Sequence, residues 1–138
     1  MIKRIDHIAI SVKDVEQAIK VFQKMGFKLL YRIPAPFGDI ADLKLPGANQ
    51  PIFELLPVTT LHQEGKTGIY HIAFLVDSAQ ETLDELKAKG IRVGTDKVHF
   101  LKETGRTHVD MRPSPDTEGW GSFFLQFVEE GKKKPITR

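Results

Sequence analysis

The chain has 138 residues, 41% of them hydrophobic and 28% charged, which suits one compact domain or two small units that share a core. This length leaves no room for a cofactor domain beside a substrate domain. Twenty basic residues against eighteen acidic ones give a net charge of +2, which is too small an excess to indicate a nucleic-acid partner.

The absence of a long apolar run and of cysteine excludes several further kinds of protein and of site. No apolar run approaches the roughly 20 residues of a membrane span, and charged residues interrupt the start before a signal-peptide core forms. We therefore expect a cytoplasmic protein that does not bind membranes. Cysteine is absent, which excludes disulfides, thiol catalysis and cysteine-bound metals, so any metal must have nitrogen and oxygen ligands.

The first predicted elements are a strand over residues 5–12 and a helix after it. Asp14 is a suitable N-cap, and Gln17 follows three residues later, as in a capping box. Gly26 lies where a left-handed residue ends a helix. Between these ends, apolar residues recur at helical spacing: Val15, Ala18, Ile19 and Phe22. Strands separated by proline or glycine breaks are then predicted over residues 28–33, 40–45 and 52–57.

The second half repeats these signals in the same order. A strand over residues 69–76 precedes a helix with Ser78 as N-cap, Glu81 as its partner and Gly90 at its end. Further strands are predicted over residues 91–94, 107–112 and 122–129. At a constant spacing of 64 residues, six positions are identical: Ile5/Ile69, His7/His71, Ile8/Ile72, Ala9/Ala73, Val12/Val76 and Gly26/Gly90.

The repeat predicts a βαβββ module used twice, in an α+β fold. We expect a single domain over residues 1–130, with modules at residues 1–60 and 67–130. Residues 131–138 then form a solvated tail.

Alternation along the first strand of each module places a histidine on the face away from the helix. His7 lies beside the small Ala9 on this face, and His71 lies beside Ala73 at the equivalent place. The small neighbours leave space next to both imidazoles. The opposite, helix-facing side is apolar in both modules: Ile8, Ile10 and Val12 in the first, and Ile72, Phe74 and Val76 in the second.

The last strand of each module carries one polar residue in an apolar run, Glu54 in the first and Gln126 in the second. A buried charge is costly unless it is paired or bound to a metal. Taken singly, Glu54 fits an ordinary hydrogen bond equally well, and each histidine fits a satisfied strand histidine better than a ligand. If a pseudo-twofold axis relates the modules, however, two imidazoles, a carboxylate and an amide oxygen converge on one divalent cation.

These segments resemble the vicinal oxygen chelate superfamily, also called the glyoxalase/bleomycin-resistance/dioxygenase fold, over about residues 4–130. The resemblance rests on Ile5–Asp14, Phe53–Pro57, His71–Asp77 and Leu125–Glu129. It implies two βαβββ modules that form a cupped, mostly antiparallel sheet around one site with a divalent metal, and it implies a homodimer. Within the family, the chain looks most similar to methylmalonyl-CoA epimerase and to glyoxalase I.

The resemblance assigns the metal ligands by position to His7, Glu54, His71 and Gln126, with Zn, Ni, Co, Mn or Fe as the ion. Isomerases and lyases of the family commonly have glutamate on the last strand, often as the base. This chain has Gln126 there, and an amide takes no proton at neutral pH. Exchanging the modules restores the epimerase-like order and makes Glu54 a ligand, a base or both. Asp39 and Asp42 are weaker candidates for a second acid.

Three functions fit these residues. The leading hypothesis is a divalent-metal-dependent isomerase or lyase that enolises a small carbonyl or thioester substrate, with Glu54 as the catalytic residue. The second is a mononuclear iron dioxygenase of the extradiol type, because two histidines and a carboxylate are the residue types of its triad. The third is a non-catalytic protein that binds a small molecule or an antibiotic in the same cup.

Three further residues are weaker candidates for substrate contacts. His108 and Arg112 share a strand face with Asp110. If this is the face of the site, Arg112 can bind a carboxylate or phosphate, although a solvated strand face explains the pattern better. Trp120, between two glycines, suits either a lid over the site or an anchor for its loop.

Overall fold

A computed structural model of the protein describes residues 1–59, 66–102, 104–112, 114–121 and 123–131. Most of the predicted tail, residues 132–138, lies outside this part. The described residues divide into two compact units. We name them the N-terminal unit, residues 7–59 and 66–70, and the C-terminal unit, residues 1–6 with the described residues from 71 to 131.

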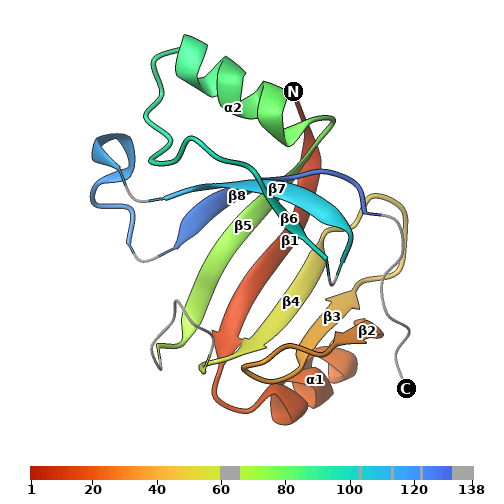
Figure 1. The fold of residues 1–138 in the computed structure, drawn as a ribbon. Coiled ribbons are helices and arrows are strands. Elements are labelled where there is room, and N and C mark those ends of the chain that lie inside the picture. Colours follow the sequence, from red (N-terminus) through yellow and green to blue (C-terminus); the bar gives the residue numbers. More distant parts are fainter. Residues whose placement is uncertain (60–65, 103, 113, 122, 132–138) are drawn as a thin grey trace. The chain divides into compact units, whose positions relative to one another are not determined.

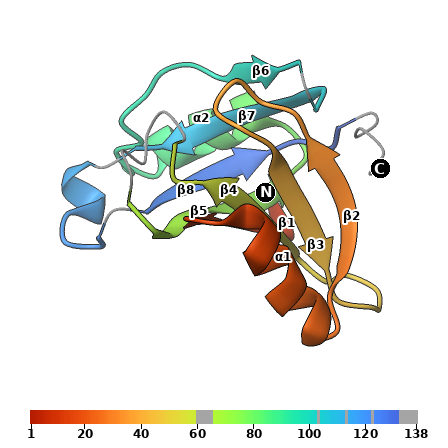
Figure 2. The ribbon, with the colours of Figure 1, turned by 90° about the horizontal axis from the view of Figure 1, so that it is seen from below.

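The N-terminal unit contains one helix and four strands (Figure 1). These are β1 (Ile2–Val12, entering from the C-terminal unit after Asp6), α1 (Val15–Lys24), β2 (Lys28–Ile33), β3 (Ile40–Lys44) and β4 (Ile52–Pro57). The strand order is β2-β3-β4-β1, in which β4 and β1 are parallel and the other pairs antiparallel. Helix α1 lies against this sheet (Figure 2) and buries Ile19 on Ala41, Leu43 and Leu55.

The C-terminal unit repeats this plan. It contains β5 (Gly68–Val76, from His71 onward), α2 (Ala79–Ala88), β6 (His99–Leu101), β7 (Arg106–Met111), a 3-10 turn (Pro115–Thr117) and β8 (Phe124–Val128). The strand order is β5-β8-β7-β6, with β5 and β8 parallel and the others antiparallel. Figure 1 shows α2 across β7 and β8, where Leu83 packs among Val76, Val109 and Phe127. The α+β fold of two βαβββ modules is therefore confirmed.

The helix ends follow the predicted signals. The carboxylate of Asp14 accepts the backbone N–H of Gln17 at 3.0 Å, and the hydroxyl of Ser78 accepts that of Glu81 at 3.1 Å. Beyond the last helical turns, Gly26 has φ +105° and Gly90 has φ +77°, both in the left-handed region that favours glycine. No helix within the described ranges is long and apolar enough to cross a membrane.

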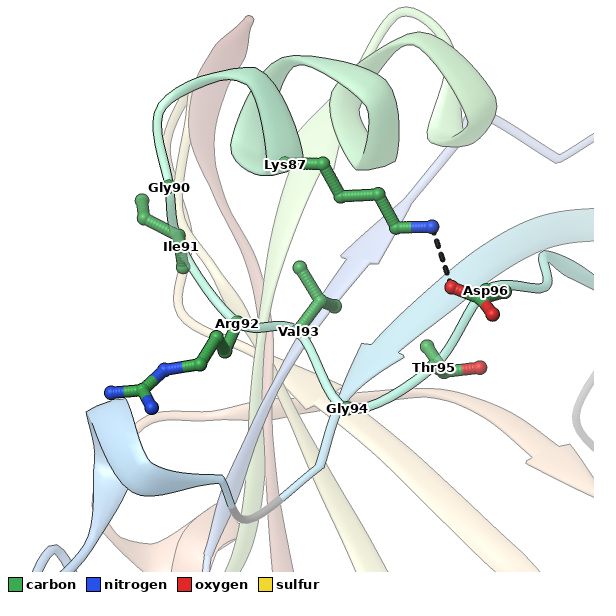
Figure 3. Close-up of a pocket in the computed structure, with 8 residues that line it drawn as sticks. All are labelled: Lys87, Gly90, Ile91, Arg92, Val93, Gly94, Thr95 and Asp96. Atoms are coloured by element: carbon green, nitrogen blue, oxygen red, sulfur yellow. Dashed lines mark hydrogen bonds and ion pairs between the residues drawn. The ribbon is translucent and has the colours of Figure 1, made fainter.

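The strand predicted over residues 91–94 is wrong. Gly94 has φ +82°, which interrupts an extended strand, and the segment is bonded to the residue after β7, from Arg112 N–H to Val93 C=O at 3.1 Å. The N–H of Arg92 instead donates to Asp116 at 2.7 Å. This segment lines a pocket of about 440 Å³. Figure 3 shows its lining residues next to α2. The edge strand forms later, as β6.

Candidate functional site

The N-terminal unit carries a row of polar side chains on the face opposite α1. Ile10 and Val12 of β1 pack towards α1, as predicted, so His7 and Ala9 lie on the other face. Residues paired across neighbouring strands share a face, and Ala9 pairs with Glu54 of β4. Glu54 therefore belongs to the same face as His7.

His7 and Glu54 lie close enough to bind one cation. The distance from His7 Nε2 to Glu54 Oε1 is 3.9 Å, which is too long for a hydrogen bond between these atoms. Two atoms bound to the same ion by bonds of about 2.1 Å lie at most about 4.2 Å apart. Both side chains are well shielded, with 8% and 15% of their areas exposed. The donor chemistry and spacing of this pair thus fit a divalent metal.

A second acid lies next to Glu54 on the same face. Asp42 of β3 pairs directly with Glu54 across the antiparallel β3–β4 ladder, and it is fully buried. Asp39, the other weak candidate, lies outside the strands and is exposed. The structure therefore separates the two aspartates and places only Asp42 beside Glu54 within the described residues.

The C-terminal unit presents the equivalent face away from α2. His71 of β5 pairs with Phe124 of β8, and the two rings lie 4.9 Å apart. Ala73, two residues on, pairs with Gln126, so His71 and Gln126 share this face, and both are buried. An imidazole and an amide oxygen are suitable ligands for Zn, Ni, Co, Mn or Fe.

Asp110 joins three other side chains on this face into one network. Asp110 of β7 pairs directly with Gln126, whose Nε2 donates to Asp110 Oδ1 at 3.0 Å. His108 Nδ1 lies 2.9 Å from the same oxygen, and Arg112 Nη2 donates to Oδ2 at 2.9 Å. Burial alone would raise the pKa of Asp110, but the hydrogen bond and charge of His108, the amide of Gln126 and the charge of Arg112 together lower it from 3.8 to about 2.

This low pKa predicts that Asp110 makes stability sensitive to acid. A folded-state pKa below the unfolded value stabilises the fold above about pH 4, and the benefit disappears as the pH falls towards 2. A shift from 3.8 to about 2 corresponds to about 2 kcal/mol. Between pH 5 and pH 2, the free energy of unfolding of Asp110→Asn, measured in urea, should therefore fall by about 2 kcal/mol less than that of the wild type. If the free energy of unfolding falls equally in Asp110→Asn and in the wild type, Asp110 does not contribute to the acid sensitivity.

The weaker substrate candidates divide between two places. Arg112 and His108 lie on the same face of the C-terminal unit as Gln126, with the Arg112 guanidinium 4.3 Å from the centre of the Phe124 ring. Trp120 is elsewhere: it is 48% exposed and stacks on Phe123. It lines a pocket of about 460 Å³ on the α2 side of the sheet, with Phe74, Met111, Leu125 and Phe127.

The two modules also share an aspartate, which was not predicted from the sequence. Asp42 opposite Glu54 corresponds to Asp110 opposite Gln126 in the ladders. The spacings between equivalent residues grow along the chain, from 64 for the histidines to 68 for the aspartates and 72 for the last pair. Because the spacing increases by four residues twice, a search for repeats at one fixed spacing does not align Asp42 with Asp110.

Comparisons with known proteins agree with this architecture. The sequence matches the family described as Glyoxalase/Bleomycin resistance protein/Dioxygenase superfamily over residues 6–109. No curated protein matches the chain. Similar solved structures include a methylmalonyl-CoA epimerase in complex with methylmalonyl-CoA and NH4+, with 19% identity, a TM-score of 0.73 and coverage of 98% of this chain and 99% of that one.

Two further structures have the same fold. The methylmalonyl-CoA epimerase of Streptomyces coelicolor is 18% identical, with a TM-score of 0.74 over 97% of this chain and 99% of that one. A hypothetical protein of Bacillus halodurans is 22% identical, with a TM-score of 0.73 over 94% and 96%. The family match spans most of the sequence, and the repeated modules are those expected of its fold. The chain belongs to the glyoxalase/bleomycin resistance protein/dioxygenase superfamily.

Proposed function

We propose that the protein is a divalent-metal-dependent isomerase or lyase that removes the proton next to the carbonyl of a small carbonyl or thioester substrate. One observation carries this proposal. Each module has a buried histidine on its first strand and a carboxylate or amide on its last strand, on the face that its helix leaves uncovered. The similarity of fold to methylmalonyl-CoA epimerases, whose substrate is such a thioester, supports this reaction class.

The proposed metal ligands are His7 and Glu54 from the N-terminal unit and His71 and Gln126 from the C-terminal unit. Two nitrogen and two oxygen donors suit Zn, Ni, Co, Mn or Fe. When bound, such an ion polarises a substrate carbonyl and stabilises the negative charge that develops on its oxygen. Membership of the superfamily supports a metal site, because its members typically bind one divalent ion.

Glu54 is the proposed base. Among the four proposed ligands it is the only carboxylate, and Gln126, at the equivalent place, takes no proton at neutral pH. Its side chain retains 15% exposure, so a substrate can reach it while most of its surface is shielded from water. Glu54 accepts the proton from the carbon next to the carbonyl; in a glyoxalase-like isomerisation it gives this proton to the neighbouring carbon of the enediolate, whereas an epimerisation also requires a second proton donor on the opposite face of the enolate.

Arg112 is the proposed contact for an anionic group on the substrate. Its guanidinium lies over the Phe124 ring, on the same face as His71, and about a third of its side chain is exposed. Only part of its hydrogen-bonding capacity is used by Asp110. A carboxylate on the substrate can therefore pair with its remaining N–H groups. His108 contributes through Asp110 rather than through a direct contact.

Titration with Co²⁺ or Zn²⁺ tests the proposed site. The wild type should bind one ion per chain. His7→Ala and His71→Ala should each weaken metal binding by about 100-fold or more, because mutating a residue that only orients a ligand can already lower metal affinity by about 100-fold. His99→Ala is the matched control, since His99 is an exposed histidine, and it should leave the affinity unchanged.

The same experiment separates the other two functions. Absence of metal uptake by the wild type would contradict the proposal and favour a non-catalytic binding protein. Oxygen uptake by the iron-loaded protein on catechols, without proton exchange on carbonyl substrates, would favour the dioxygenase. Binding that His7→Ala weakens and His71→Ala does not would show that the two ligand pairs do not share an ion.

A further inference from the structure

The hydrogen bond between Asp110 and Gln126 determines which atom of the Gln126 amide can face a ligand. The two residues are direct partners in the β7–β8 ladder, both side chains are buried, and Nε2 lies 3.0 Å from Asp110 Oδ1. A carboxylate only accepts hydrogen bonds, so the amide must turn its NH₂ group towards Asp110. The reverse orientation would place two oxygens in contact. Oε1 of Gln126 is consequently directed away from Asp110.

Asp110 is itself held on two sides. His108 Nδ1 lies 2.9 Å from Oδ1, and Arg112 Nη2 donates to Oδ2 at 2.9 Å. Arg112 is in turn packed over the Phe124 ring at 4.3 Å. With one neighbour along β7 on each side, the carboxylate cannot rotate without breaking a charge-assisted hydrogen bond. The Asp110 carboxylate that orients Gln126 is therefore held in place by His108 and Arg112, its neighbours along the same strand.

The other module explains why an amide at position 126 fits this arrangement. There the equivalent partners are Asp42 and Glu54, two acids side by side across the ladder. A glutamate at position 126 would place a second carboxylate beside that of Asp110, and the two would have to share His108 Nδ1 as their nearest donor. Gln126 avoids this repulsion and gains a hydrogen bond.

We propose that Asp110 is a positioning residue that orients the Gln126 amide so that Oε1, rather than the NH₂ group, is offered to the metal. This inference rests on the proposed function, because it requires Gln126 to be a ligand. Under this inference the equivalent residues of the two modules have different roles. Glu54 transfers the proton, and Gln126 is a neutral metal ligand with a fixed orientation. Side chains that orient metal ligands typically change metal affinity by 10- to 100-fold.

A double-mutant cycle on metal affinity tests the inference. The dissociation constant for Co²⁺ alone is measured by competition with a chelating indicator in the wild type, Asp110→Ala, Gln126→Ala and the double variant. Asp110→Ala should weaken binding about tenfold in the wild-type background and less than about twofold in the Gln126→Ala background. A purely electrostatic loss of the Asp110 charge would instead persist in both backgrounds.

The Co²⁺ absorption spectrum gives a second readout. Asp110→Ala and Gln126→Ala should change the visible bands in the same way, because both remove the amide oxygen from the ion. Asp110→Asn, whose side chain keeps an acceptor for Gln126 Nε2 and nearly the same volume, should restore both the spectrum and most of the affinity. If Asp110→Ala fails to fold, Asp110→Asn can still overturn the inference, since a spectrum that changes towards that of Gln126→Ala would contradict it.

The possible failures are distinguishable. No Co²⁺ binding by the wild type, or binding that ignores His7→Ala and His71→Ala, would overturn the proposed function and this inference with it. Binding that depends on both histidines but is equally affected by Asp110→Ala in the two backgrounds, or not affected at all, would overturn only the positioning role. Binding that is unaffected by Gln126→Ala would do the same.

Discussion

Replacing Glu54 with glutamine should reduce turnover by about 10³-fold, because the amide keeps the shape and an oxygen of the side chain but takes no proton. The substitution also preserves the environment of the strand. Glu54 lies beside Ala9 and Asp42 in the ladders, and glutamine has nearly the same size and brings no new charge to this position. The loss should therefore be one of chemistry and not of folding.

The measurement is the exchange of the substrate's α-proton in D₂O, followed by NMR. Suitable substrates are methylmalonyl thioesters and methylglyoxal–thiol adducts, which cover epimerase-like and glyoxalase-like reactions. Glu54→Gln should retain bound Co²⁺, because its side-chain oxygen remains a possible ligand. Asp39→Asn, which removes an exposed acid of the same unit, is the control and should retain full activity. Full exchange activity in Glu54→Gln would rule out Glu54 as the base.

Local signals were sufficient to predict both helices and the faces of the strands. The caps at Asp14 and Ser78 and the glycines at the helix ends act through neighbouring residues, so the sequence around them contains the whole interaction. Alternation likewise placed His7 and His71 opposite the helices without any knowledge of pairing.

The contacts between strands could not be predicted in the same way. That Glu54 lies beside Ala9, or Gln126 beside Asp110, depends on the register of strands that are far apart in sequence. One residue of slip would move these side chains to the other face. The edge strand of the second module was misplaced for a related reason: residues 91–94 have strand-like composition, but the left-handed Gly94 and the bond from Arg92 to Asp116 hold them in another conformation.

Replacing Arg106 with methionine should destabilise the fold by about 3–5 kcal/mol, the usual cost of removing one partner from a buried ion pair. The Arg106 guanidinium donates to both carboxylate oxygens of Asp6, at 2.9 and 2.8 Å, and its Nε donates to the backbone carbonyl of Glu129 at 2.7 Å. Only 7% of Arg106 and 5% of Asp6 is exposed. Such a loss is a large part of the 5–15 kcal/mol that stabilises a typical domain.

A double variant distinguishes the cost of leaving the Asp6 charge buried and unpaired from the net stabilisation that the ion pair provides. Arg106→Met leaves the charge of Asp6 buried without the guanidinium, whereas Asp6→Leu combined with Arg106→Met removes both charges and should be more stable than Arg106→Met alone. Lys87→Met, which breaks the exposed pair between Lys87 and Asp96 seen in Figure 3, is the control and should change the urea midpoint little. If Arg106→Met is no less stable than Lys87→Met, the buried pair does not secure the start of β1 to β7. If the double variant is as unstable as Arg106→Met, the cost lies in lost packing and in the carbonyl of Glu129, and not in the buried charge of Asp6.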